Sequence, residues 1–327
     1  MGLNAETIND LINSEENQRS IEDARALIHS RPCVLFAGAG TSKLAGYPLW
    51  RELLDEMQTR LADRGLADPR KDPDNLLRSA DELYDCFDKN GLLDPDYYSF
   101  LYQTFRPKPT QSLELQNILL SLPFRGIATT NWDKCFEMAI RRDWPERTQS
   151  LFECSFHAEH PNHVRDYFDS LWRDAPSISV GHLHGVYDFA KEIILTASQY
   201  DDAYGSGGKW TFLRRTIWAL MTTQRLIFVG FGMDDPFITT LLKFVSGELW
   251  DRNGRVHYFI THVSADTKKD PIAYRRGLRA EMGVQSIFYQ VQGNDHSRLS
   301  DLLYDLGANP AANRRGQPRV SELLGPL

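Results

Sequence analysis

The sequence predicts an α/β fold in which a doubly wound parallel sheet carries a helical insertion subdomain. Two patterns support this prediction: short apolar runs that are typical of buried parallel strands, and helical segments that separate most of these runs. The chain of 327 residues is 42% hydrophobic and 11% aromatic, which suffices to fill a sizeable core. We therefore expect a globular protein and not a disordered chain.

The elements are expected in the following order along the chain. Residues 1–30 are predicted to form a helix that packs on the core, because residues 5–29 carry apolar side chains at helical spacing. The first strand, Cys33–Ala37, follows this helix. Residues 51–122 keep a helical pattern that prolines interrupt, and they are predicted to be the insertion. The end of the chain, 309–327, is rich in Pro, Arg and Asn and is predicted to be an extended tail.

The rest of the sheet is predicted from apolar runs that follow the insertion. Their length and their flanking turn residues favour buried strands over helices. The predicted strands are residues 126–129, 178–180, 193–195, 226–229, 256–260 and 286–289.

Composition excludes or disfavours several functional classes. The formal charge of −7 gives no electrostatic support for direct binding of nucleic acid, which needs clustered Lys and Arg. The four cysteines form no C-x-x-C pair, which argues against a zinc ribbon and a disulfide framework, so we expect reduced thiols in a cytoplasmic protein. The N-terminus has no apolar signal region and no uncharged run reaches about 18 residues, so no membrane association is expected.

The first candidate motif, G-A-G-T-S, follows the first predicted strand directly. Gly38, Ala39 and Gly40 would direct backbone N–H groups towards an anion at the start of a helix, and Thr41 and Ser42 would add hydroxyl donors. The alternative is an ordinary tight strand-to-helix turn.

The sequence around this motif departs from an ordinary dehydrogenase fingerprint. Lys43 stands where that fingerprint has its third glycine, and no acidic residue ends a second strand about 20 residues later. A second turn, A-G-Y-P, follows and ends at Pro48.

The second motif, T-T-N-W-D, follows the strand predicted at 126–129. Thr130, Asn131 and Asp133 lie where a strand ends and a helix begins, which is where ligands bind in an open α/β sheet. Capping of the helix N-terminus by Thr or Asn is the alternative explanation.

The third motif, G-H-L-H-G, places His182 and His184 two residues apart at the end of another predicted strand. Histidine can act as a general base at neutral pH, and Gly185 would let a substrate approach His184 closely. A metal site would need a third ligand, which no spacing indicates. For His182, a hydrogen-bonded histidine in the core is the alternative.

The fourth motif, G-F-G-M-D-D-P, follows the strand predicted at 226–229. Gly230, Gly232 and Asp234 are candidates for a second loop that faces a nucleotide across the same crevice. Asp followed by Pro is also good chemistry for a helix start by itself.

In this order and spacing, the four motifs resemble those of the sirtuin family over residues 33–296. The resemblance implies a Rossmann-like NAD-binding core at 31–50 and 123–308. In such a core the first loop, residues 38–42 with Pro48 and Thr130 nearby, would bind the NAD phosphates. The resemblance further implies Asn131 beside the nicotinamide ribose and its attacking water, Asp133 at the nicotinamide end, and His184 as the general base. It places Gly230, Gly232 and Asp234 at the adenosine ribose.

Two departures narrow the resemblance. Sirtuins that deacetylate proteins carry a four-cysteine zinc module and a P-D-F-R sequence, whereas this chain has no C-x-x-C and reads P-L-W-R from Pro48. These features are similar to the sirtuin-like domains of bacterial antiphage systems, which hydrolyse NAD.

The predicted function is hydrolysis of NAD+ to nicotinamide and ADP-ribose, with NAD as substrate and no metal. Asn131 would orient the water or the ribose, His184 would accept a proton, and Asp133 would fix the carboxamide. Two alternatives remain open: an NAD-dependent deacylase or ADP-ribosyltransferase, and a non-catalytic subunit that binds NAD or ADP-ribose as a regulatory ligand.

An NAD hydrolase that acted freely would empty its own cell, so some control of the activity is expected. We expect an abortive-infection effector that is gated by assembly into a homo-oligomer or by a partner. Related systems use a HerA-type ATPase or a short Argonaute, and the former is preferred here.

Overall fold

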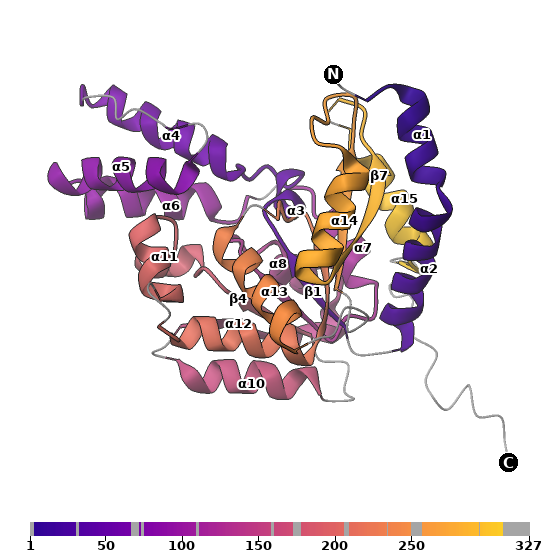
Figure 1. Ribbon diagram of the computed structural model, residues 1–327. Helices are drawn as coiled ribbons and strands as arrows, with labels where there is room; N and C mark the ends of the chain where they lie inside the picture. Colours follow the sequence, from indigo (N-terminus) through magenta and orange to yellow (C-terminus); the bar gives the residue numbers. More distant parts are fainter. Residues whose placement is uncertain are drawn as a thin grey trace, which may run out of the picture.

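The computed structural model contains a parallel sheet with helices on both faces (Figure 1). It describes residues 3–30, 33–66, 72, 75–108, 111–157, 160–172, 178–205, 209–233, 235–249, 257–293 and 295–309. Within them the sheet has seven strands in the order β3-β4-β2-β1-β5-β6-β7, and every pair is parallel. The strands are β1 (Cys33–Ala37), β2 (Gly126–Thr129), β3 (Phe152–Ser155), β4 (Ser179–His182), β5 (Arg225–Val229), β6 (His257–Val263) and β7 (Val284–Gln290). The predicted Rossmann-like α/β fold class is confirmed.

The core has two layers because the central strands are buried on both faces. Along β1, Cys33, Leu35 and Ala37 belong to one apolar cluster, and Val34 and Phe36 belong to the other. The first cluster includes side chains of the helices that cover one face: α2 (Glu15–Ser30), α7 (Glu114–Leu120), α8 (Cys135–Asp143) and α15 (Ser297–Asp305). The second includes those of α10 (Pro161–Leu171), α12 (Phe212–Thr223), α13 (Pro236–Leu249) and α14 (Pro271–Met282).

The N-terminal segment forms two helices where the sequence predicted one. The helix α1 (Ala5–Asn13) ends at Ser14, whose hydroxyl donates to Leu11 O at 2.8 Å, and α2 begins at the next residue. In α2 the buried Asn17 side chain donates to Phe288 O at 3.1 Å and accepts from Phe288 N at 2.9 Å. It therefore satisfies backbone groups of the edge strand β7, which the N-terminal helices cover.

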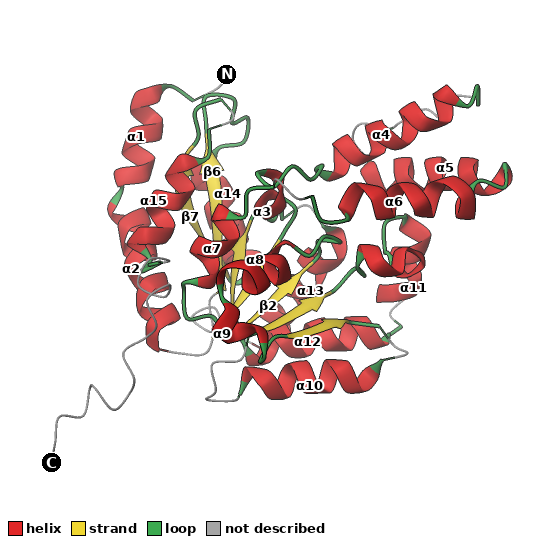
Figure 2. Cartoon of the chain, turned by 180° about the vertical axis from the view of Figure 1, so that it is seen from behind, coloured by secondary structure: helices red, strands yellow, loops and turns green. Residues whose placement is uncertain are grey.

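The regular structure of the predicted insertion is helical among the residues that the structure describes. No strand occurs among the described residues from 49 to 122. Figure 2 shows that α4 (Trp50–Asp63), α5 (Leu76–Lys89) and α6 (Tyr98–Phe105) project together from one side of the sheet; the π-helix η1 (Leu93–Tyr97) precedes α6. The last helix of the stretch, α7, instead packs on α8 and α15. The domain boundaries stay a prediction, and residues 310–327 of the expected tail lie outside the described residues.

One predicted strand is wrong. Residues 193–195 form a buried loop after the 3-10 helix η2 (Tyr187–Glu192), and Ile194 N donates to His184 O at 3.0 Å. Their apolar character serves packing of the loop, with Ile193 and Leu195 in the core cluster. The sheet instead contains β3, an edge strand that pairs only with β4 and mixes polar with apolar residues, so its apolar signal is weak.

In the part of the chain that the structure describes, no helix is both long and apolar enough to span a lipid bilayer.

The order of the strands fixes where the loops meet. The chain runs from β1 to β2 on one side and later returns to β5 on the other side of β1, so residues after β1 and β5 flank the crevice where the winding reverses. A Cβ atom on Gly38 would lie 2.5 Å from Gly230 O, and a Cβ on Gly230, at φ +64°, would lie 2.4 Å from Thr41 N. These two glycines therefore let two backbones touch.

We predict that Gly230→Ala lowers the free energy of unfolding by about 2 kcal/mol or more, because a side chain there meets backbone and needs a positive φ. Thermal unfolding followed by circular dichroism measures the change. Gly247→Ala is the control: it lies exposed in α13 with no atom within 4 Å of the added Cβ. It should raise stability by about 0.5–1 kcal/mol. Equal melting temperatures for the two variants would contradict the prediction.

Candidate active site

The four motifs meet at the carboxyl edge of the sheet. The strand register pairs Ala37 with Thr129 and with Val229, and Thr129 with His182, so β1, β2, β4 and β5 end at the same level. The loops that follow these strands therefore lie side by side, as the sequence predicted for a ligand site.

The side chain of Asn131 ties the second loop to the first. Its Nδ2 amide lies 3.1 Å from Gly38 O, 3.2 Å from Thr41 Oγ1 and 3.0 Å from Ser42 Oγ. The carbonyl of Gly38 can only accept a hydrogen bond, so the atom of the Asn131 amide that faces it must be the nitrogen. The opposite atom, Asn131 Oδ1, is buried and has no hydrogen-bond partner among the described residues. The arrangement thus leaves one acceptor available to a ligand.

Four backbone N–H groups of the glycine loop, those of Gly38, Gly40, Thr41 and Ser42, donate within the protein. Gly38 N donates to Val229 O at 3.0 Å, and Gly40 N donates to Gly230 O at 2.8 Å. At the start of the short helix α3 (Gly40–Lys43), Thr41 N donates to Gly38 O at 2.9 Å and Ser42 N donates to Ala39 O at 3.0 Å. The tight-turn explanation therefore accounts for these glycines, and their contact with a phosphate stays a prediction.

His184 lies at the centre of the site and is only 2% exposed. Its Nε2 lies 2.6 Å from the hydroxyl of Tyr204, and its Nδ1 lies 3.3 Å from the hydroxyl of Tyr200. Both tyrosines belong to α11 (Ala197–Tyr204). Burial lowers the pKa of His184 to about 4, although the charge of Asp235 opposes the shift. At neutral pH the imidazole is uncharged, which is the form a general base requires.

His182 serves a different purpose from His184. Its Nδ1 lies 2.8 Å from Asn131 O and its Nε2 lies 2.7 Å from Glu137 Oε1. Burial would lower the pKa of His182, but the carboxylate of Glu137 and the carbonyl of Asn131 outweigh it and raise the pKa. Both ring nitrogens can then donate, and the ring fixes the backbone that carries Asn131.

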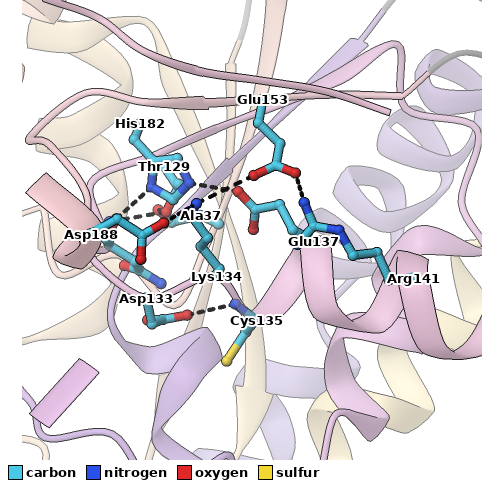
Figure 3. A network of polar contacts seen from close by, with 11 residues as sticks. Ala37, Thr129, Asp133, Lys134, Cys135, Glu137, Arg141, Glu153, His182 and Asp188 are labelled. Carbon is cyan, nitrogen blue, oxygen red and sulfur yellow. Dashed lines mark hydrogen bonds and ion pairs between the residues drawn. The ribbon is translucent and has the colours of Figure 1, made fainter. Parts of the chain in front are cut away.

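A polar network surrounds His182 and its partner Glu137 (Figure 3). Glu137 lies on α8 beside Lys134, which forms ion pairs with Asp188 and with Glu153, the latter at 3.5 Å. Arg141 also pairs with Glu153. Within the described part of the chain, no group of three or more His, Cys, Asp or Glu residues is placed to hold a metal ion.

Asp133 is buried at the start of α8. Its Oδ1 accepts from Cys135 N at 3.0 Å, so an N–H group at the start of this helix is bound by Asp and not by the Thr or Asn that the alternative explanation named. Burial raises the pKa of Asp133, while hydrogen bonds from Cys135 and Ser42 act in the opposite direction. The carboxyl group is thus held close to the first loop and to Asn131.

The other predicted site residues are more dispersed. Thr130 is half-buried and its N–H donates to Ala37 O at 3.3 Å; Gly232 is exposed, and Asp234 lies outside the described residues. Pro48 lines a groove of about 540 Å³ between α4 and α6, away from the buried centre formed by Asn131 and His184.

Sequence reasoning missed three residues that contact the histidine or its partners: Tyr200, Tyr204 and Asp235. The two tyrosines are four residues apart and so share one helix face, which is the available signal. The same spacing is typical of aromatic residues that pack in a core, and both rings do stack on Phe237. No local pattern distinguishes the two roles.

We predict that Asn131→Asp lowers the free energy of unfolding by about 1–3 kcal/mol, because a carboxylate oxygen would face Gly38 O where a donor now lies. Chemical denaturation measures the loss. Asn162→Asp, an isosteric change at an exposed position near the start of α10, should have almost no effect. An unchanged denaturation midpoint for Asn131→Asp would show that this amide does not hold the loop.

We predict that His184 makes the fold less stable in mild acid. The unfolded chain protonates this residue near its ordinary value of 6.5 and the folded chain near 4, so stability present above pH 6.5 is lost as the pH falls towards 4. From pH 7 to pH 5 the loss from this group is about 2 kcal/mol.

The measurement compares wild type with His184→Gln at both pH values, so that contributions from other residues, including His182, cancel. The variant should lose about 2 kcal/mol less than wild type over this range. The exposed His163→Gln should keep the wild-type dependence. The same pH dependence in wild type and His184→Gln would refute the prediction.

Comparison with known proteins agrees with the resemblance inferred from the four motifs. Residues 125–287 match the SIR2-like domain. The chain is 27% identical over 287 residues to the NAD(+) hydrolase ThsA of Enterococcus faecium. The aligned segment covers 82% of this chain and 54% of that protein. The chain is 25% identical over 244 residues to the protein of the same name from Cytobacillus dafuensis, covering 73% of this chain and 42% of that protein.

The chain thus spans about half the length of the curated relatives it matches. Asn131, His184 and Gly230 lie inside the matched segment, which begins after the first glycine loop. The sheet and the comparisons together show a Rossmann-like α/β fold in which residues 125–287 match the SIR2-like domain.

Proposed function

We propose that the protein is an NAD+ hydrolase that cleaves nicotinamide from NAD+ and releases ADP-ribose. The observation that carries the proposal is that β2 and β4 end at the same level. The residues after them include a buried, uncharged His184 and Asn131, whose Oδ1 has no partner among the described residues. Both lie at the crevice of a SIR2-like domain. The names of the two relatives support the same activity.

The residues present fit a dinucleotide substrate in two respects. Ala39, Gly40 and Gly230 are partly exposed at the edge of the crevice and Gly232 is exposed, so a phosphate chain would meet small residues there. Deeper in the site, Asn131 Oδ1 offers an acceptor for a hydroxyl or a water.

The chemistry needs little from the protein beyond orientation and a base. Water adds to C1′ of the nicotinamide ribose as the bond from C1′ to the ring nitrogen breaks, and nicotinamide leaves with the electron pair. Asn131 Oδ1 orients the water or a ribose hydroxyl, and His184 Nε2 accepts the proton. Asp133 is proposed to bind the carboxamide of nicotinamide.

The site is closed around His184, because the hydroxyl of Tyr204 is hydrogen-bonded to Nε2 of this histidine. A substrate hydroxyl or water can reach that nitrogen only after Tyr204 has moved. This fits an activity that needs a conformational change before it begins. We propose that the protein is an abortive-infection effector, gated by assembly into a homo-oligomer or by a HerA-type ATPase or other defence subunit. The four free cysteines agree with the proposed cytoplasmic location.

We predict that His184→Ala and Asn131→Ala each lower NAD+ turnover by about 10²- to 10⁴-fold. Nicotinamide and ADP-ribose are followed by chromatography, with the purified chain alone and with a candidate ATPase. His163→Ala, which removes an exposed imidazole from α10, is the matched control and should keep wild-type activity.

Retention of wild-type turnover by His184→Ala would sink the proposed mechanism. Transfer of labelled ADP-ribose to a protein, or loss of an acyl group from a peptide, would identify the transferase or deacylase alternative. Tight binding of NAD+ without any release of nicotinamide, in every assembly state, would identify a regulatory ligand.

A further inference from the structure

The carboxylate of Asp235 reaches His184 through the hydroxyl of Tyr200. Asp235 is 9% exposed and lies just before α13. Its Oδ2 accepts from the Tyr200 hydroxyl at 3.1 Å, and the same hydroxyl lies 3.3 Å from His184 Nδ1. Tyr200 and His184 are themselves buried, so the chain of contacts is shielded from water.

Counting protons along this chain fixes the tautomer of His184. A tyrosine hydroxyl has one hydrogen, and Tyr200 gives it to the carboxylate, which can only accept. Tyr200 must then accept from His184, so the imidazole hydrogen is on Nδ1. With one hydrogen on a neutral ring, Nε2 carries the lone pair and accepts from Tyr204. This is the nitrogen that the proposed reaction uses as base.

We propose that Asp235, acting through Tyr200, is a positioning residue that keeps the hydrogen of His184 on Nδ1 and its lone pair on Nε2. The proposal rests on the proposed function and extends it. When Nε2 takes up the proton of a hydroxyl or a water, the ring becomes a cation. The carboxylate of Asp235, which contacts the ring through the hydroxyl of Tyr200, then stabilises that cation.

A purely structural role for Asp235 is the competing explanation. Its other oxygen, Oδ1, accepts from Phe237 N and Ile238 N at 2.9 Å each, as a helix cap does. The chain offers a matched case: Asp270 also precedes a proline at a helix start, and its Oδ1 accepts from Ile272 N at 2.9 Å at the exposed start of α14. A cap and a positioning residue can therefore be compared within one protein.

The test is Asp235→Asn, which keeps the capping oxygen and replaces Oδ2 by a donor. The new amide would donate to Tyr200, whose hydrogen would turn to His184 Nδ1 and force the ring hydrogen onto Nε2. We expect the ¹⁵N shifts of His184, assigned with His184→Gln, to change from the Nδ1–H to the Nε2–H tautomer. We also expect kcat for NAD+ to fall about 10²-fold with KM nearly unchanged. Asp270→Asn should change neither quantity.

Tyr200→Phe supplies a second line of evidence, because it keeps the ring that stacks on Phe237 and removes only the hydroxyl. If the two residues act as one unit, the double variant Asp235→Asn/Tyr200→Phe should be no slower than Tyr200→Phe alone. Additive losses would show that Asp235 acts independently of Tyr200 and would overturn the proposal.

The two readouts separate this proposal from the proposed function. If wild type hydrolyses NAD+ and Asp235→Asn keeps both its kcat and the Nδ1–H tautomer, the positioning role is wrong and the hydrolase stands. If no assembly state releases nicotinamide but Asp235→Asn still exchanges the tautomer, the hydrolase is wrong and the positioning of His184 stands.

Discussion

The contact between two glycine backbones is the constraint on which the rest of the site depends. Gly40 N donates to Gly230 O at 2.8 Å, and no side chain fits between the loops that follow β1 and β5. This contact continues the pairing of β1 with β5, which are distant in the chain, at the position where the winding of the sheet reverses. Asn131 can then reach Gly38 and Ser42 from the neighbouring strand end.

The two histidines of one motif show how burial and partners shift the pKa of the same side chain in opposite directions. His182 lies between a carboxylate and a carbonyl oxygen, which favour the protonated ring, whereas His184 lies among tyrosines, and burial keeps it neutral. The ring of His182 therefore holds the backbone of Asn131, and the neutral ring of His184 keeps a lone pair for chemistry. Residues only two apart in sequence can take these different roles because β4 ends between them, at His182.

Sequence reasoning identified the fold class and the loops because both depend on local patterns. Apolar runs showed most strands, and the four motifs marked strand ends that the parallel register aligns. It could not identify Tyr200 or Asp235, whose roles depend on how α11 and α13 pack around His184. It also missed β3, since an edge strand with a half-exposed pattern lacks a strong apolar signal. Distant packing, not local propensity, decides these cases.

The helix α11 gives the insertion an energetic connection to the imidazole. It supplies both tyrosines that contact His184, and its Ser198 N donates to Asp81 Oδ1 of α5 at 3.3 Å. A molecule that binds α5 more tightly when α11 has shifted would favour the open centre. By thermodynamic reciprocity, a substrate that needs the open centre would strengthen binding of that molecule by the same factor. A measured change in the affinity of a partner for the insertion would then show whether substrate is bound at His184, even when no substrate is turned over.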